Sequence, residues 1–274
     1  MDDARMGFPP AIPRARGTRI AADPMLLRIG VAVILSLLLT LPALLLDGRM
    51  LQGENVWVKP IKFQIALAIY LVTLAVFASL LPKDAAITRR LRWIGLALTL
   101  GTLAELLWVG GSAMFATASH YNPHPVMSAI YLSMGGVATV LILGSLMMGL
   151  SFWSARDNHL PEALRLSLAL GLILTFVLTL PAAGTLAALP GHFIGTPVTG
   201  AVVPIMGWSR EVGDLRVAHF LAMHALHAVP LIGVAAMGLS NPALARGLVW
   251  AGALGYAALT AFAFVQALAG QPAF

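Results

Sequence analysis

A row of ionisable side chains interrupts the hydrophobic segment 215–239. At about 100° per residue on a helix, Arg216, His219 and His227 fall within about 80° of one another, and His224 borders them. Hydrocarbon offers such groups no hydrogen-bond partners, so ionisable residues on a membrane helix usually face the protein interior or a wet cavity. The three histidines could therefore bind a metal or cofactor, or they could hydrogen-bond to neighbouring helices.

The spacing of these histidines limits the metal chemistry. His219 and His227 are about 12 Å apart along a helix, so they cannot share one ion whose metal–nitrogen bonds are about 2.0–2.1 Å. A haem b would need axial nitrogens on opposite faces of the macrocycle, and hence histidines from two different segments. The candidate ligands for a haem b or a divalent metal are His120, His192, His219 and His224.

Glu105 is the only acidic residue deep inside a hydrophobic segment, the one at 93–118. An acidic residue at the centre of a membrane helix costs about 2.5–3.5 kcal/mol, which the surrounding leucines can offset. Glu105 could be a neutral carboxyl group hydrogen-bonded to a helix. It could otherwise serve as a proton relay, a metal ligand or a general base.

Asp214 and Arg216 begin the histidine-bearing segment. Asp214 is placed to accept hydrogen bonds from the free N–H groups of the first helical turn. Arg216 then stands where the positive end of the helix dipole disfavours a cation, so an anionic group should compensate it. That group could be Asp214 or Glu211, or a bound carboxylate, phosphate or lipid headgroup. The candidate catalytic residues are Glu105, Asp214 and Arg216.

Two lysines, Lys59 and Lys62, flank Pro60 at the start of another hydrophobic segment. Pro is a natural first residue of a helix, so both lysines should lie at the membrane edge. They could extend to lipid headgroups along their aliphatic stems. With Arg216, they could instead form an anion-binding site.

The composition places these residues in a membrane protein. Of the 274 residues 59% are hydrophobic and 10% charged, whereas soluble domains have about 45–50% and about 25%. The mean hydropathy is +0.88, and apolar runs of about 20 residues recur without the alternation of barrel strands. The expected fold is therefore an all-α, polytopic membrane protein. The absence of cysteine excludes disulfides, thiolate nucleophiles and iron–sulfur clusters.

Hydropathy, with Pro, Gly and charge as boundaries, predicts seven membrane-spanning helices. A flexible cytoplasmic tail at 1–24 should precede one transmembrane domain at 25–268, with a short outer tail at 269–274. The predicted spans are 25–46, 60–82, 93–118, 126–153, 164–189, 215–239 and 247–268.

The distribution of Lys and Arg predicts the orientation. Twelve of the 17 fall in the N-terminal tail, in the connections after the second, fourth and sixth spans, and at the adjoining helix ends. The positive-inside rule then puts the N-terminus in the cytoplasm and the C-terminus outside, and it accounts for the net charge of +6 without nucleic acid as a partner. All histidines but His159 lie in the outer connections or in spans that these enter, so we expect an outward-opening site.

Three motifs resemble those of an uncharacterised family of bacterial multi-pass membrane proteins. W-x-K-P-x-K-F occupies 57–63, S-H-[FY]-N occupies 119–122, and G-W-S-x-x-x-G-D-L-R-x-x-H-F-x-x-x-H-A-L occupies 207–226. The chain departs from the family pattern at 192–195, where His-Thr-Val-Gly is usual, and at His227, where Gln is usual. The resemblance implies a bacterial cytoplasmic membrane as the location and implies no particular activity.

The leading hypothesis is a cavity among the second, third, fifth and sixth spans that binds a metal or haem in a redox or hydrolytic role. The third and sixth spans should face one another, with His120 and His192 over the outer end. A second hypothesis is a transporter or sensor that binds a small anionic solute or relays protons. A third is a zinc-dependent intramembrane hydrolase, by analogy with other seven-span, histidine-rich enzymes. The expected partners are the lipid bilayer and a small-molecule or lipid ligand.

Overall fold

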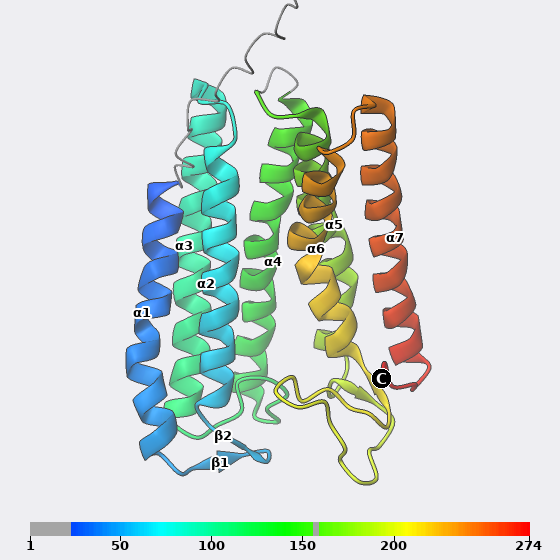
Figure 1. Cartoon of the computed structure of the whole chain (residues 1–274). Coiled ribbons are helices and arrows are strands. Elements are labelled where there is room, and N and C mark those ends of the chain that lie inside the picture. Colours follow the sequence, from blue (N-terminus) through cyan, green and yellow to red (C-terminus); the bar gives the residue numbers. More distant parts are fainter. Residues whose placement is uncertain (1–22, 156–158) are drawn as a thin grey trace, which may run out of the picture.

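The protein is a bundle of long helices whose connections carry short hairpins (Figure 1). The computed structural model describes residues 23–155 and 159–274, so most of the predicted tail at 1–24 lies outside the described residues. Seven of the described helices are long and apolar enough to cross a membrane, which confirms the predicted all-α, multi-pass fold. The helices are α1 (Pro24–Leu46), α2 (Val58–Ser79), α3 (Ala85–Met114), α4 (Pro125–Ser154), α5 (Glu162–Ala188), α6 (Leu215–Ala236) and α7 (Pro242–Leu268).

The observed helix ends lie close to the predicted ones, with two main exceptions. The helix α3 begins at Ala85, where the Asp84 carboxylate accepts a 2.8 Å hydrogen bond from the backbone N–H of Ile87. Similarly, α7 begins at Pro242 because Asn241 caps its first turn. In both cases a polar cap extends the helix beyond the apolar stretch that hydropathy detects.

The helices form two groups of three that α4 joins. On one side α1 and α3 pack on α2, and on the other side α5 and α7 pack on α6. The helix α4 packs on α3 and on α5 and lies between the groups in Figure 1. Close packing of α5 on α6 depends on Gly171, where a Cβ atom would come within 2.8 Å of the Pro230 ring. The predicted direct packing of the third span on the sixth is not seen in the described chain.

All the longer connections lie at one end of the bundle, which we call the loop end. It contains the segments 47–57, 115–124 and 189–214, together with the C-terminus (Figure 1). The first segment holds the hairpin β1 (Met50–Leu51) with β2 (Glu54–Asn55). The third holds β3 (Phe193–Ile194), which pairs with β4 (Gly213–Asp214) just before α6.

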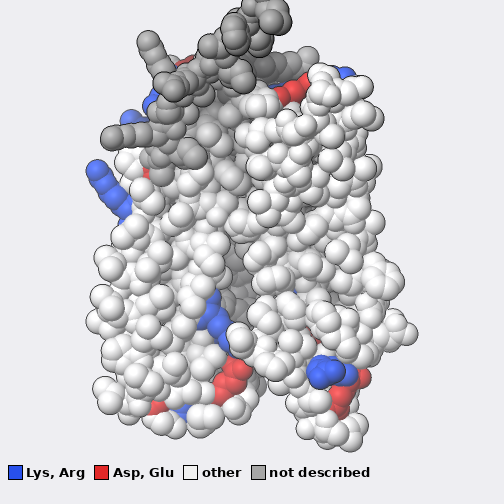
Figure 2. All heavy atoms as spheres, in the orientation of Figure 1, with Lys and Arg blue, Asp and Glu red and all other residues white. Residues whose placement is uncertain are grey.

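A cleft separates α2 from α6 at the loop end. A side-chain hydrogen bond joins the two helices farther along, between Thr73 and His227. Figure 2 shows this face hollowed between the two groups of helices, with basic and acidic side chains beside the lower end of the hollow. We call this space the α2–α6 cleft.

Candidate functional site

One wall of the cleft mouth is built around the Asp214 carboxylate. Its side chain is fully buried and accepts hydrogen bonds from the backbone N–H of Arg216 at 3.1 Å and of Ser209 at 2.9 Å. The Arg216 guanidinium donates to both carboxylate oxygens, at 2.9 Å from Nε and 2.6 Å from Nη2. Asp214 therefore caps α6 as predicted, and it is the anionic group that compensates Arg216.

The residues of the third motif support this arrangement. Arg216 Nη2 also donates to the carbonyl of Gly207, at 2.6 Å, and Gly207 has a positive φ of +71°. At Gly213 the carbonyl of Ala267 occupies the space that a Cβ atom would need. The motif at 207–216 thus forms a hydrogen-bonded frame that presents the Arg216 side chain beside the cleft.

Glu211 belongs to a separate part of the outer loop. Its carboxylate accepts hydrogen bonds from the backbone N–H groups of Val198, Thr199 and Ala201 and from the Thr199 hydroxyl. These donors hold the pKa of Glu211 at about 2. Glu211 therefore holds the loop together and does not compensate Arg216, which was the other alternative from the sequence.

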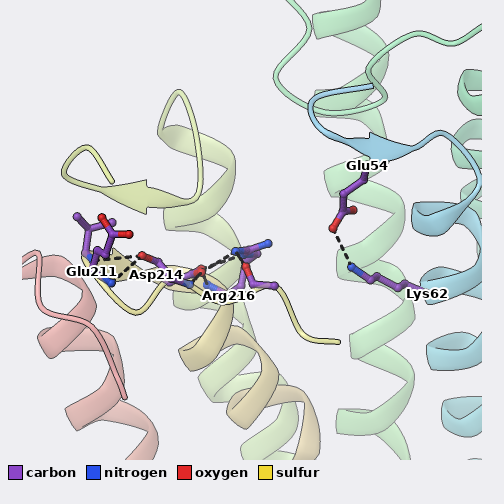
Figure 3. A network of polar contacts seen from close by, with 8 residues as sticks. Glu54, Lys62, Glu211, Asp214 and Arg216 are labelled. Carbon is purple, nitrogen blue, oxygen red and sulfur yellow. Dashed lines mark hydrogen bonds and ion pairs between the residues drawn. The ribbon is translucent and has the colours of Figure 1, made fainter. Parts of the chain in front are cut away.

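The opposite wall of the mouth comes from the β1–β2 hairpin and the start of α2. Lys62 Nζ lies 3.5 Å from Glu54 Oε1, a long contact between two exposed side chains. Figure 3 shows this pair on one side of the space and the Asp214–Arg216 pair on the other, with Arg216 extended toward the Glu54 side. A Cβ atom on Gly207 would be 3.8 Å from Glu54 Oε1, so the two walls approach each other at the mouth.

An aromatic cluster surrounds His120 at the loop end. The His120 ring lies 4.6 Å from Tyr131, 6.1 Å from Phe63 and 6.4 Å from Tyr121, measured between ring centroids. Tyr121 lies 6.5 Å from His192 on its other side. His120 and His192 therefore both lie beside Tyr121.

Both loop histidines are held neutral. Burial and the nearby Lys59 ammonium lower the pKa of His120 to about 3. Burial and the Arg216 guanidinium lower the pKa of His192, and Asp214 partly opposes this effect. At neutral pH these rings can therefore accept or donate hydrogen bonds but add no charge.

Lys59, half-buried near the start of α2, and Glu105, buried on α3, lie on neighbouring helices. Glu105 is 5% exposed and forms no ion pair within 4.0 Å in the described chain. The segment after α3 is fixed nearby, because Trp108 Nε1 donates to the carbonyl of Ser119 at 3.1 Å. Two buried hydroxyls on α3, those of Thr102 and Ser112, have no hydrogen-bond partner among the described residues. Water or a ligand could satisfy these groups.

The α6 histidines have three different environments. His227 Nε2 lies 3.0 Å from the Thr73 hydroxyl of α2. His224 Nδ1 donates to the carbonyl of Phe220 at 2.8 Å. His219 Nδ1 is buried and has no partner in the described chain.

The four predicted ligands do not form a metal centre in the part of the chain that the structure describes. No group of three His, Asp or Glu side chains there could hold a metal ion. His120 and His192 each lie beside Tyr121, whereas His219 and His224 lie five residues apart on α6. A metal or haem site therefore stays a prediction from residue type.

Sequence reasoning missed several residues of the site. Glu54, Tyr121 and Tyr131 contact predicted site residues, and Thr73 forms a hydrogen bond with His227, but none of the four was identified from its spacing. The sequence did contain a signal for Thr73, because this residue lies fourteen positions after Lys59 and therefore on the same face of the helix.

Comparisons with protein-family models, with curated proteins and with solved structures found no match to this chain. The resemblance of its motifs to a bacterial membrane-protein family therefore stays a prediction.

Proposed function

We propose that this membrane protein binds an anionic ligand, through a carboxylate or phosphate group, in the α2–α6 cleft, and that it acts as a transporter or sensor of that ligand. The observation that carries the proposal is that Lys59 is partly buried and has no partner for its charge. Among the described Lys and Arg residues, Lys59 is the one that is partly buried yet forms neither a hydrogen bond nor an ion pair. A partly desolvated ammonium group favours an anionic partner.

The surrounding groups support an anion more than a metal cation. Lys62 and Arg216 stand on opposite walls of the mouth, and their partners are the exposed Glu54 and the buried Asp214. Arg216 uses Nε and Nη2 in its bonds to the protein, which leaves Nη1 for a ligand. Glu54 and Asp214 offset the charges of Lys62 and Arg216, so the unpaired Lys59 ammonium is the group that would favour a carboxylate or phosphate over a metal ion.

Glu105 gives the proposed site a means of coupling to protons. Its carboxyl group is buried on α3, the helix that packs on α2. A proton exchanged at this group as the anion binds would give the coupling that a proton-linked transporter needs, in agreement with the second hypothesis from the sequence.

The proposal is tested by thermal unfolding of the purified protein in a non-ionic detergent. Sodium phosphate and sodium benzoate are compared with sodium chloride at equal ionic strength, for the wild type, Lys59→Gln and Lys83→Gln. Lys83 is exposed at the opposite end of the bundle and serves as the matched control. We expect at least one of these anions to stabilise the wild type and Lys83→Gln but not Lys59→Gln. Equal stabilisation of all three proteins would contradict the proposal.

The same preparation tests the metal hypothesis. An absorption spectrum and elemental analysis should show no Soret band and no stoichiometric metal. A haem spectrum, or one metal ion per chain, would favour the redox or hydrolytic role predicted from the histidines and would overturn the proposal.

A further inference from the structure

The α2 wall of the cleft changes from basic to apolar along its length. Lys59, Ala66 and Thr73 are spaced by seven residues and therefore lie on one face of α2. Thr73 shows where this face points, because its hydroxyl reaches His227 on α6. Ala66 is exposed between the two ends, and Ile69 beside it is 51% exposed. The middle of this wall is therefore an uncovered apolar strip.

The α6 wall also changes from basic to apolar along its length. His227 and Phe220 are seven residues apart, with Met223 between them on the same face. All three are partly exposed, whereas the other side of α6 is buried against α5 and α7. Arg216 stands at the loop end of this face. Each wall therefore has cations at the loop end, apolar groups in the middle and one residue of the Thr73–His227 bond at the far end.

The length of this strip suits a hydrocarbon chain. From Lys62 to Thr73 the helix rises by about 16 Å at 1.5 Å per residue. The hollow in Figure 2 is open along the side of the bundle, at the height of helices that are long and apolar enough to span a membrane. Such an opening faces the acyl chains of the bilayer. A small water-soluble anion would use the cationic mouth and leave the apolar strip without a partner.

We propose that the ligand of the α2–α6 cleft is an anionic phospholipid from the membrane leaflet at the loop end. Its phosphate contacts Lys59, with Lys62 and Arg216 on either side. One acyl chain lies between Ala66 on α2 and Phe220 on α6. This inference rests on the proposed anion site and adds that the ligand enters sideways from the bilayer.

The experiment measures lipid binding to the purified full chain in a non-ionic detergent by native mass spectrometry. The probes are phosphatidylglycerol, phosphatidylcholine and soluble glycerol 3-phosphate. Ala66→Trp fills the apolar strip while leaving every cation in place. Leu254→Trp, at a residue of α7 that is 64% exposed, is the matched control for a new Trp on the lipid-facing surface. Lys59→Gln tests the phosphate contact.

We expect the wild type and Leu254→Trp to retain phosphatidylglycerol in preference to phosphatidylcholine. Ala66→Trp and Lys59→Gln should each bind phosphatidylglycerol about tenfold more weakly, as expected for the loss of one major contact. Thermal unfolding of each variant without lipid confirms that it is folded.

The other outcomes separate the two proposals. If glycerol 3-phosphate binds in a Lys59-dependent way but Ala66→Trp has no effect on phosphatidylglycerol, the lipid inference is wrong and the anion site stands. If phosphatidylglycerol binds equally to the wild type and to Lys59→Gln, the lipid occupies another surface and the inference is wrong. If no anionic probe depends on Lys59, both proposals fail.

Discussion

The Thr73 hydroxyl on α2 and the His227 imidazole on α6 meet at 3.0 Å, and this bond joins the helices on the two sides of the cleft. It lies at the far end of the α2–α6 cleft from the cationic mouth. The bond thereby connects the two groups of helices where the apolar strip ends. Its geometry also explains why a Gln could replace His227, because a Gln amide can donate to or accept from a hydroxyl.

Substitutions at this bond should separate hydrogen bonding from metal ligation. His227→Gln keeps a partner for Thr73, so we expect thermal stability and anion binding close to those of the wild type. His227→Leu leaves the Thr73 hydroxyl unpaired and should destabilise the protein by about 1–3 kcal/mol. Thermal unfolding in detergent measures both effects. An equal loss of stability in the two variants would contradict the role given to the hydrogen bond and would favour a role that Gln cannot supply, such as metal ligation.

The Asp214–Arg216 pair should be the most sensitive part of the cleft mouth. Asp214→Asn retains a capping side chain but leaves Arg216 without its buried counter-charge, so we expect a loss of about 2–4 kcal/mol. Asp84→Asn, at the exposed cap of α3, is the control and should be nearly silent because Asn caps about as well as Asp. Similar unfolding temperatures for the two variants would contradict the role given to this pair.

Burial of His120 should make the folding stability of the protein sensitive to acid. Its pKa is about 3 in the folded protein and about 6.5 in an unfolded chain, so acidification below about pH 6.5 favours the unfolded state. At pH 5 this linkage removes about 2 kcal/mol of stability relative to neutral pH. His120→Gln should therefore lose less stability than the wild type between pH 7 and pH 5. The exposed control, His124→Gln, should lose as much stability as the wild type over this range. An unchanged pH dependence in His120→Gln would show that His120 is not buried as described.

The orientation predicted from the basic residues can be tested with reporter fusions. We expect a fusion after Phe274 to report an extracytoplasmic location and a fusion in the 82–92 connection to report a cytoplasmic one. The loop end, which holds the cleft mouth and the C-terminus, would then face outward. A cytoplasmic C-terminus would place the cleft mouth inside the cell.

Local features of the structure could be predicted from the sequence, and contacts between distant segments could not. The seven spans follow from apolar length, and the cap at Asp214 follows from its place before an apolar run. The bond from Thr73 to His227 and the approach of Gly207 to Glu54 depend on which helices and loops are neighbours. Periodicity gives the face of each helix but does not say which helix lies opposite. We expected α3 to pack on α6, but the helix that packs closely on α6 is α5, where Gly171 lies against Pro230.

The central claim is that Lys59 binds an anionic group in the α2–α6 cleft. It is tested most directly by titration calorimetry, with the anion that most stabilises the wild type added to the wild type, Lys59→Gln and Lys83→Gln in the same non-ionic detergent. The account predicts a dissociation constant at least about tenfold larger for Lys59→Gln, as expected for the loss of a charge-assisted contact, and an unchanged value for Lys83→Gln. Equal dissociation constants for all three proteins, or no measurable heat with any of them, would contradict it.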